Sequence, residues 1–294
     1  MGKAPETLAD LVAPLPEDEF VTLLRERRLT LTRGAGRYRY SELMNWRGLL
    51  DLIRQGRHPI NFSEFSLVMD SKMAPPDRWW KKNPEGEGNV VNLPNLLEFM
   101  RAGFSLTYYG LETYEPRLKV LCDNIRSRLR EQVKIGAIVT MNRPSAFTLH
   151  YDPEDLLILQ VEGRKRWKIF GPPVVNPLVG IAPPAPPPED TLILDEVLEP
   201  GDFLFLPAGY WHRCENQSDR SLHLGVFLQP PSGLDIVKAI TSQLLSDDQF
   251  RMPLTRFDGS FDLEAVEVEI KNRALEQIAK LDLKEFLAEF ERQS

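Results

Sequence analysis

Two short stretches of this 294-residue chain place histidine and aspartate side chains where they could bind a metal ion. In FTLHYDPED, His150 and Asp152 are two residues apart, and side chains at i and i+2 of a strand point to the same face. His212 follows sixty residues after Asp152, at the end of EPGDFLFLPAGYWHR, where a strand-like run lies between two glycine-containing turns. The spacing predicts that these three side chains meet at one point inside a barrel.

Two neutral imidazoles and one carboxylate on one face leave three adjacent coordination positions of a metal ion open. That arrangement is typical of non-haem iron(II) oxygenases. Zinc more often completes a tetrahedron with further cysteine or histidine ligands, and the sequence offers no obvious ones. An isolated H-x-D pair is common by chance, so the second motif at His212 is what favours a metal site. His223, in SLHLGVFL, could replace His212 as ligand, line the pocket, or be an ordinary interior histidine.

A lysine in a predicted hairpin adds independent support. In LLILQVEGRKRWKIF the chain turns at Glu162–Gly163, and the returning strand alternates a basic, solvated face with an inward face that holds Lys165, Trp167 and Ile169. An inward lysine is costly unless it meets an anion, and the terminal carboxylate of 2-oxoglutarate would be such an anion. The alternative is a lysine that extends along the strand end into water.

The elements that must position these residues change character along the chain. From residue 135 to 227 short runs rich in Val, Ile, Leu and Phe predict strands of an antiparallel sandwich or barrel: IVTM, AFTLHY, LLILQV, RWKIF, TLILDEV, DFLFLP and SLHLGVFL. Apolar residues at helical spacing predict helices before and after this part, over residues 16–27, 41–55, 94–102, 116–132, 234–245, 262–278 and 283–292. We therefore expect a helical N-terminal region (1–103) packed on the barrel, a catalytic core (104–231) and a C-terminal helical region (232–294).

Two details of this prediction concern particular segments. Ser41 is the expected N-cap of the helix over 41–55, and residues 70–90 are expected to form a loop that carries Trp79 and Trp80. The proline-rich stretch PPVVNPLVGIAPPAPPPED could be a docking ligand, but a rigid surface connection between two strands is the favoured interpretation.

Composition limits the classes of function. The formal net charge is -7, which disfavours nonspecific binding to nucleic acid, because neutralisation of phosphates supplies most of that affinity. We see no secretory signal and no apolar run long enough for a membrane helix. Two cysteines, Cys122 and Cys214, cannot form a disulfide framework, so we expect a cytoplasmic protein.

The run LHYDPEDLLILQVEGRKRWKIF, followed by LEPGDFLFLPAGYWHR, resembles the JmjC-type, cupin-like oxygenases of the ribosomal-oxygenase group. The resemblance implies a mainly β fold with flanking helices, in which a double-stranded β-helix (jelly roll) binds iron(II) through H-x-D and a distal histidine. It also implies that a basic residue fifteen positions after the first histidine, here Lys165, holds 2-oxoglutarate. A tyrosine frequent in the group is replaced by Ile138, so Asn142 or Thr148 would supply that hydrogen bond instead.

The resemblance implies a 2-oxoglutarate-dependent dioxygenase with iron(II), 2-oxoglutarate and O2, which hydroxylates a side chain in a peptide or protein. The most specific expectation is β-hydroxylation of histidine, with a ribosomally made peptide natural product as one substrate. The alternatives are a hydroxylase of a small molecule such as a free amino acid, and a cupin-like binding protein without turnover. Histone demethylation receives no support, because the sequence shows no chromatin-reading module. The resemblance also implies a homodimer, because related proteins often dimerise through helices beside the barrel.

Overall fold

The computed structural model describes residues 4–34, 39–56, 63–82, 89–142, 146–251 and 262–292. The chain forms two compact units, one made of Met1–Leu129 with Val133–Gln229 and the other of Arg130–Gln132 with Pro230–Ser294. The three-region division stays a prediction.

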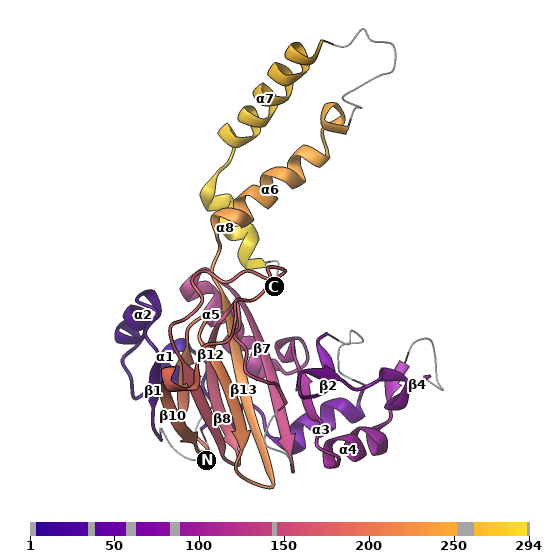
Figure 1. The fold of residues 1–294 in the computed structure, drawn as a ribbon, viewed down its shortest axis with the longest axis vertical. Coiled ribbons are helices and arrows are strands. Elements are labelled where there is room, and N and C mark those ends of the chain that lie inside the picture. The colour runs from indigo at the N-terminus through magenta and orange to yellow at the C-terminus, as the bar shows by residue number, and fades with distance from the viewer. Residues whose placement is uncertain are drawn as a thin grey trace. The chain divides into compact units, whose positions relative to one another are not determined.

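The larger unit is built on an eight-stranded sheet (Figure 1). Its order is β1-β11-β8-β13-β7-β6-β2-β3, and its strands are β1 (Thr30–Thr32), β11 (Phe203–Leu206), β8 (Asp155–Glu162), β13 (Arg220–Gln229), β7 (Gln132–Met141), β6 (Ser105–Tyr108), β2 (Phe65–Met69) and β3 (Lys72–Met73). A separate two-stranded ribbon joins β4 (Trp80–Lys82) to β5 (Asn89–Val91).

A second, smaller sheet faces the first and has the order β10-β9-β12, with β10 (Leu192–Leu198), β9 (Lys165–Phe170) and β12 (Trp211–Asn216). An isolated antiparallel bridge between His150 and His212 adds one further row beside β12. From β7 onward the chain alternates between the large and the small sheet: β7, the His150 bridge, β8, β9 with β10, β11, β12 and β13. This alternation makes a double-stranded β-helix, so the predicted fold class is confirmed.

The strand β8 contributes side chains both to the interior of the barrel and to the core formed with the N-terminal helices. Seven of its eight residues are buried, because both faces of the strand are covered. Leu157 and Leu159 pack into the cluster that includes the N-terminal helices, while Leu156 and Ile158 point into the barrel toward Trp167 of β9. Since alternate side chains of a strand point to opposite faces, one apolar run serves two cores.

Four helices of the larger unit lie where the sequence predicted helices: α2 (Glu17–Arg25), α3 (Trp46–Arg54), α4 (Leu93–Arg101) and α5 (Pro116–Leu129). The short helix α1 (Leu8–Val12) was not predicted. Single 3-10 turns occur at Tyr40–Glu42, Pro76–Arg78, Leu111–Thr113 and Glu189–Thr191.

The prediction that Ser41 caps α3 is wrong. Ser41 lies in the first 3-10 turn, and Asn45 caps the helix by accepting a hydrogen bond from the Gly48 N–H at 3.0 Å. Asparagine is among the strongest N-cap residues, so it defines the helix start at the expense of the serine four residues earlier.

The expectation of a loop over 70–90 was also incomplete. The ribbon strands β4 and β5 lie there, and both Trp79 and Trp80 are buried against Phe65. Residues 83–88 of this stretch lie outside the described residues.

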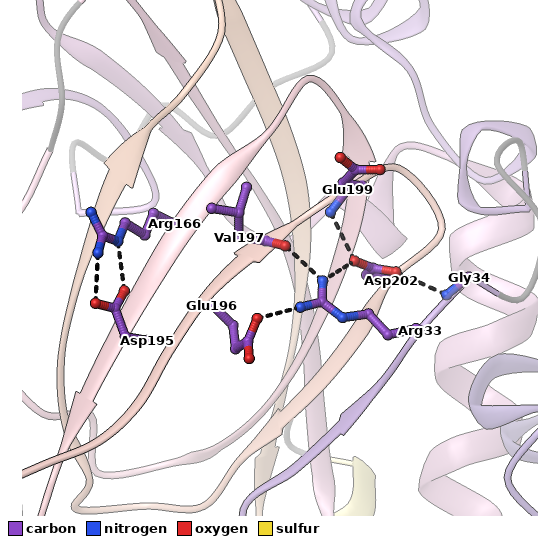
Figure 2. Close-up of polar contacts among 8 residues, drawn as sticks. All are labelled: Arg33, Gly34, Arg166, Asp195, Glu196, Val197, Glu199 and Asp202. Atoms are coloured by element: carbon purple, nitrogen blue, oxygen red, sulfur yellow. Dashed lines mark hydrogen bonds and ion pairs between the residues drawn. The ribbon is translucent and has the colours of Figure 1, made fainter.

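A short N-terminal strand is tied to the barrel by polar contacts (Figure 2). β1 pairs with β11, and directly after it Arg33 donates to the Asp202 carboxylate at 2.7 Å, to the Val197 carbonyl at 2.6 Å and to Glu196 at 2.6 Å. Asp202 is buried and also accepts from the backbone N–H groups of Gly34 and Glu199. A carboxylate that accepts three hydrogen bonds fixes the turn between β10 and β11.

The smaller unit is helical, with α6 (Gly233–Leu245), a 3-10 turn at Asp248–Arg251, α7 (Leu263–Ala279) and α8 (Leu283–Arg292). Several large apolar side chains of these helices are exposed, including Leu234, Val237, Leu263, Val268 and Leu275. Within the described part of the chain, no helix combines the length and apolar character needed to cross a membrane.

Candidate metal centre

The backbone brings the two predicted histidine ligands opposite each other. The His150 N–H donates to the His212 carbonyl at 3.1 Å, and the His212 N–H donates back to the His150 carbonyl at 2.7 Å. Their rings face one another with centroids 4.3 Å apart. A reciprocal backbone pair of this kind fixes both Cα–Cβ directions, so the two imidazoles point to the same side of the small sheet.

Asp152 completes the cluster from the loop that follows the bridge. Its carboxylate lies 3.8 Å from Nε2 of His150 and 3.4 Å from Nε2 of His212. The Gly209 N–H donates to the Asp152 carbonyl at 2.9 Å, which ties this loop to the turn before His212. One donor atom from each of His150, Asp152 and His212 lies within 4.8 Å of the others, so the described residues contain a group that could hold a metal ion.

The tautomers of both histidines follow from their outer contacts. Nδ1 of His150 lies 2.8 Å from the Thr148 carbonyl, and Nδ1 of His212 lies 3.0 Å from the Tyr210 carbonyl. A carbonyl oxygen only accepts, so each Nδ1 must carry the proton and donate it. Each Nε2 then presents a lone pair to the centre, as metal-binding histidines require.

Burial keeps His212 uncharged. The residue is 3% exposed, and desolvation, with a smaller repulsion from His150, lowers the pKa of His212 to about 4. Trp167 stacks on its ring with centroids 5.7 Å apart and an interplanar angle of 28°. At neutral pH the imidazole is therefore free of a second proton that would compete with a metal ion.

Lys165 lies in the same cavity as the three candidate ligands. The cavity has a volume of about 140 Å³, and Lys165 is 2% exposed at the start of β9. Its Nζ donates to Oγ1 of Thr140 at 3.4 Å, and burial lowers the pKa of Lys165. The alternation of β9 predicted that Lys165 points inward, and the structure shows this orientation. The cavity therefore contains a basic side chain as well as the three candidate metal ligands.

Asn142 and Thr148, the two residues expected to supply a further hydrogen bond to 2-oxoglutarate, lie outside that cavity. Asn142 is exposed and its side chain donates to the Arg101 carbonyl at 3.4 Å. Thr148 is exposed and its hydroxyl lies 2.9 Å from the Ser71 hydroxyl. The structure does not bring either side chain to Lys165; the hydroxyl that reaches Lys165 belongs to Thr140, two residues before Asn142.

Tyr109 lines the cavity and was missed by the sequence analysis. Tyr109 directly follows β6, and its ring lies against Gly136 of β7. A side chain at position 136 would clash with the ring, because a Cβ there would lie 2.6 Å from it. Its ring packs edge-on against Phe227 at 5.3 Å. Burial, with Asp152 and Glu154 nearby, raises the pKa of the Tyr109 hydroxyl. No local motif marks this residue, because it comes from a strand about forty positions before the H-x-D pair.

His223 also lines the cavity, on β13. It packs edge-on against Trp167 with ring centroids 5.5 Å apart, and its Nδ1 finds no hydrogen-bond partner among the described residues. Its donor atoms are not part of the cluster that could hold a metal ion. Of the three interpretations offered by the sequence, a pocket-lining histidine fits these contacts.

The chain thus combines a cupin-like double-stranded β-helix with a cluster of one carboxylate and two imidazoles. Residues 112–236 match the family model of the JmjC domain. This match confirms the resemblance seen in the motifs of that part of the chain.

Curated relatives agree with this assignment. "Bifunctional lysine-specific demethylase and histidyl-hydroxylase NO66" of Drosophila willistoni is 28% identical over 213 residues, which cover 71% of this chain and 27% of that protein. "Ribosomal oxygenase 1" of Homo sapiens is 27% identical over 218 residues, covering 73% and 33%. The chain thus spans about a third or less of the length of these two relatives.

Solved structures share the fold. YcfD, a ribosomal oxygenase from Escherichia coli, superposes with a TM-score of 0.54 at 18% identity, over 93% of this chain and 71% of that one. A structure of the same protein in complex with cobalt and 2-oxoglutarate gives a TM-score of 0.54 at 17% identity, covering 94% and 71%.

Proposed function

We propose that this chain is an iron(II)- and 2-oxoglutarate-dependent dioxygenase that hydroxylates a side chain in a peptide or protein. The observation that carries the proposal is the gathering of two Nε2 atoms and one carboxylate within 4.8 Å, with both Nδ1 atoms turned outward to carbonyls. That donor set suits a metal ion that keeps three adjacent positions open. His150, Asp152 and His212 are the proposed ligands.

Iron(II) held there would activate O2 with 2-oxoglutarate as the reductant, giving succinate, carbon dioxide and one oxygen atom for a C–H bond of the substrate. The protein's own residues supply binding and orientation. Lys165 would pair with the distal carboxylate of 2-oxoglutarate, and the Thr140 hydroxyl that accepts from its ammonium would help to hold it in place. Trp167 fixes the ring plane of His212, and the apolar side chains around them exclude water.

The substrate class rests on the relatives. One relative is named a histidyl-hydroxylase and another a ribosomal oxygenase, which supports a protein substrate. We extend this to the present chain as hydroxylation of a protein or peptide, with β-hydroxylation of histidine as the specific reaction and a ribosomally made peptide as one substrate.

The test is oxygen-dependent turnover. Purified protein is incubated with iron(II), 2-oxoglutarate and O2, and succinate is measured with and without candidate peptides. We expect slow uncoupled succinate formation that is abolished by His150→Ala. If succinate never forms, with or without peptides, the enzyme proposal is wrong and a binding protein of cupin type is the better description.

Three further proposals concern the setting of the enzyme. The exposed apolar side chains of α6 and α7 support a homodimer formed through the helical unit. The two free cysteines support a cytoplasmic location, and the net charge of -7 supports the absence of a nucleic-acid partner. Sedimentation of the purified protein tests the dimer.

A further inference from the structure

A second cavity, larger than the first, lies beside the candidate metal centre. Its volume is about 400 Å³, within the range of ligand pockets, and we call it the proline groove. Its lining comes from the segment around the H-x-D motif (Leu149, His150, Tyr151 and Pro153), from residues 178–186 of the proline-rich connection, and from Trp211.

The proline groove is continuous with the metal centre through one side chain. His150 lines both cavities and is 31% exposed. Because its Nδ1 is held by the Thr148 carbonyl, its Nε2 faces the ligand cluster while another part of the ring borders the groove. A molecule that fills the groove therefore touches the edge of the proposed reaction site.

The walls of the groove are apolar. Tyr151 and Trp211 pack edge-on with centroids 5.0 Å apart, and Val179 and Ile181 of the proline-rich connection are 77% and 64% exposed. Apart from His150, the lining residues of the described chain carry no ionisable side chain other than the Tyr151 phenol. Apolar side chains exposed along a concave surface mark a binding site for an apolar partner group.

The proline-rich wall is held in place at both ends. The Val174 N–H donates to the Gly209 carbonyl at 2.9 Å, in the turn directly before His212. At the far end Arg213, the residue after His212, binds the Glu189 carboxylate with two hydrogen bonds of 2.7 and 3.0 Å. Proline fixes φ, so a segment anchored this way loses little conformational entropy when a ligand binds.

We infer that the proline groove binds a bulky apolar side chain of an extended peptide substrate, a few residues from the residue that is oxidised. The inference rests on the proposed function and adds the substrate's sequence preference. A free amino acid that reaches the metal centre would leave the 400 Å³ groove empty, whereas a peptide fills both, since consecutive residues of an extended chain advance about 3.3–3.6 Å.

Peptide selection with a matched pair of variants tests this. Ile181→Asp places a charge in the groove wall, and Val175→Asp places the same charge on the same segment at a residue that is 80% exposed and outside the lining. Each protein is immobilised with Mn(II) and an unreactive analogue of 2-oxoglutarate, and a pool of random dodecapeptides is selected for binding. Succinate formation is measured in parallel.

We expect wild type and Val175→Asp to enrich peptides with Leu, Phe, Trp or another large apolar residue, and Ile181→Asp to lose that enrichment at least tenfold. Uncoupled succinate formation should be equal in all three proteins. Enrichment that is absent in wild type, or equal in the two variants, overturns the inference. So does a change of oligomeric state confined to Ile181→Asp with selection unchanged, because the groove would then be a contact between copies. Absence of succinate in wild type would count against the proposed function, whatever the peptides show.

Discussion

Lys165 is a buried cation whose only described hydrogen bond reaches a neutral hydroxyl. Removing an ammonium from water costs several kcal/mol unless an anion shares its cavity. Thr140, at 3.4 Å, offers weak compensation, and burial accordingly lowers the pKa of Lys165. A bound carboxylate would favour the charged form of Lys165, which suits the anionic co-substrate proposed above.

Replacing Lys165 by alanine should raise the KM for 2-oxoglutarate by about 30-fold or more, because loss of a buried charge partner costs about 2 kcal/mol or more. Lys168→Ala is the control, since Lys168 lies on the outer face of the same strand and pairs with Glu215 at 3.0 Å. Succinate formation measured against 2-oxoglutarate concentration reports both values. Equal KM values for the two variants would show that Lys165 does not bind 2-oxoglutarate.

The identity of the distal ligand can be decided between two histidines that line the same cavity. His212→Ala should weaken Mn(II) binding by more than about 100-fold, because even residues that only support metal ligands contribute 10- to 100-fold. His223→Ala should keep Mn(II) affinity within a few-fold, since its donor atoms lie outside the cluster. Calorimetric titration of metal-free protein measures both, and the reverse order would make His223 the ligand.

For individual strands, the regularity of the alternation between inward and outward side chains determined what the sequence could predict. β9 alternates cleanly, so Lys165 was assigned to the inner face correctly. The stretch AFTLHY was expected to be a strand, yet the structure gives it only the single bridge at His150. β12 was not expected as a strand, because WHRCEN has no apolar alternation; backbone pairing with β9 forms it instead.

The turn between β10 and β11 offers a test of what a buried carboxylate contributes. Asp202→Ala removes the acceptor of Arg33 and of two backbone N–H groups, so we expect a loss of about 2–3 kcal/mol of unfolding free energy. Asp195→Ala breaks an exposed bidentate pair with Arg166, visible in the same view (Figure 2), and should barely move the urea midpoint. Urea unfolding of the three proteins distinguishes them, and similar midpoints for the two variants would refute the assignment.

For the whole molecule, the helical N-terminal expectation was right for α2, α3 and α4 but missed α1 and the strands that extend the large sheet. β2 is the run FSLVM, a short buried apolar segment that periodicity alone cannot separate from a helix. Tyr109 and Thr140 reach the site through that same sheet, since β6 pairs with β7. Contacts made by long-range pairing leave no local pattern, whereas the H-x-D motif and Lys165 lie within sixteen consecutive residues.

Folding encloses two neutral histidines, and this makes the stability of the metal-free protein depend on pH. Burial lowers the pKa of His223 well below 6.5, and that of His212 to about 4. In the unfolded chain both histidines titrate near 6.5. Below pH 6.5 the unfolded state binds protons that the folded state does not bind. The contribution of each histidine to the free energy of unfolding is therefore fully present above pH 6.5 and is lost as the pH falls.

The variant His223→Leu isolates one of these groups. Between pH 7 and 8 wild type and variant should differ by a constant amount, and below pH 6.5 wild type should lose about 1.4 kcal/mol more per pH unit than the variant. Buried carboxyls with raised pKa values, such as Asp155 and Glu112, act in the opposite direction, but they are common to both proteins and cancel in the difference. Urea unfolding from pH 5 to 8 in the presence of a chelator provides the data. Parallel curves over that range would mean that His223 is protonated inside the folded barrel.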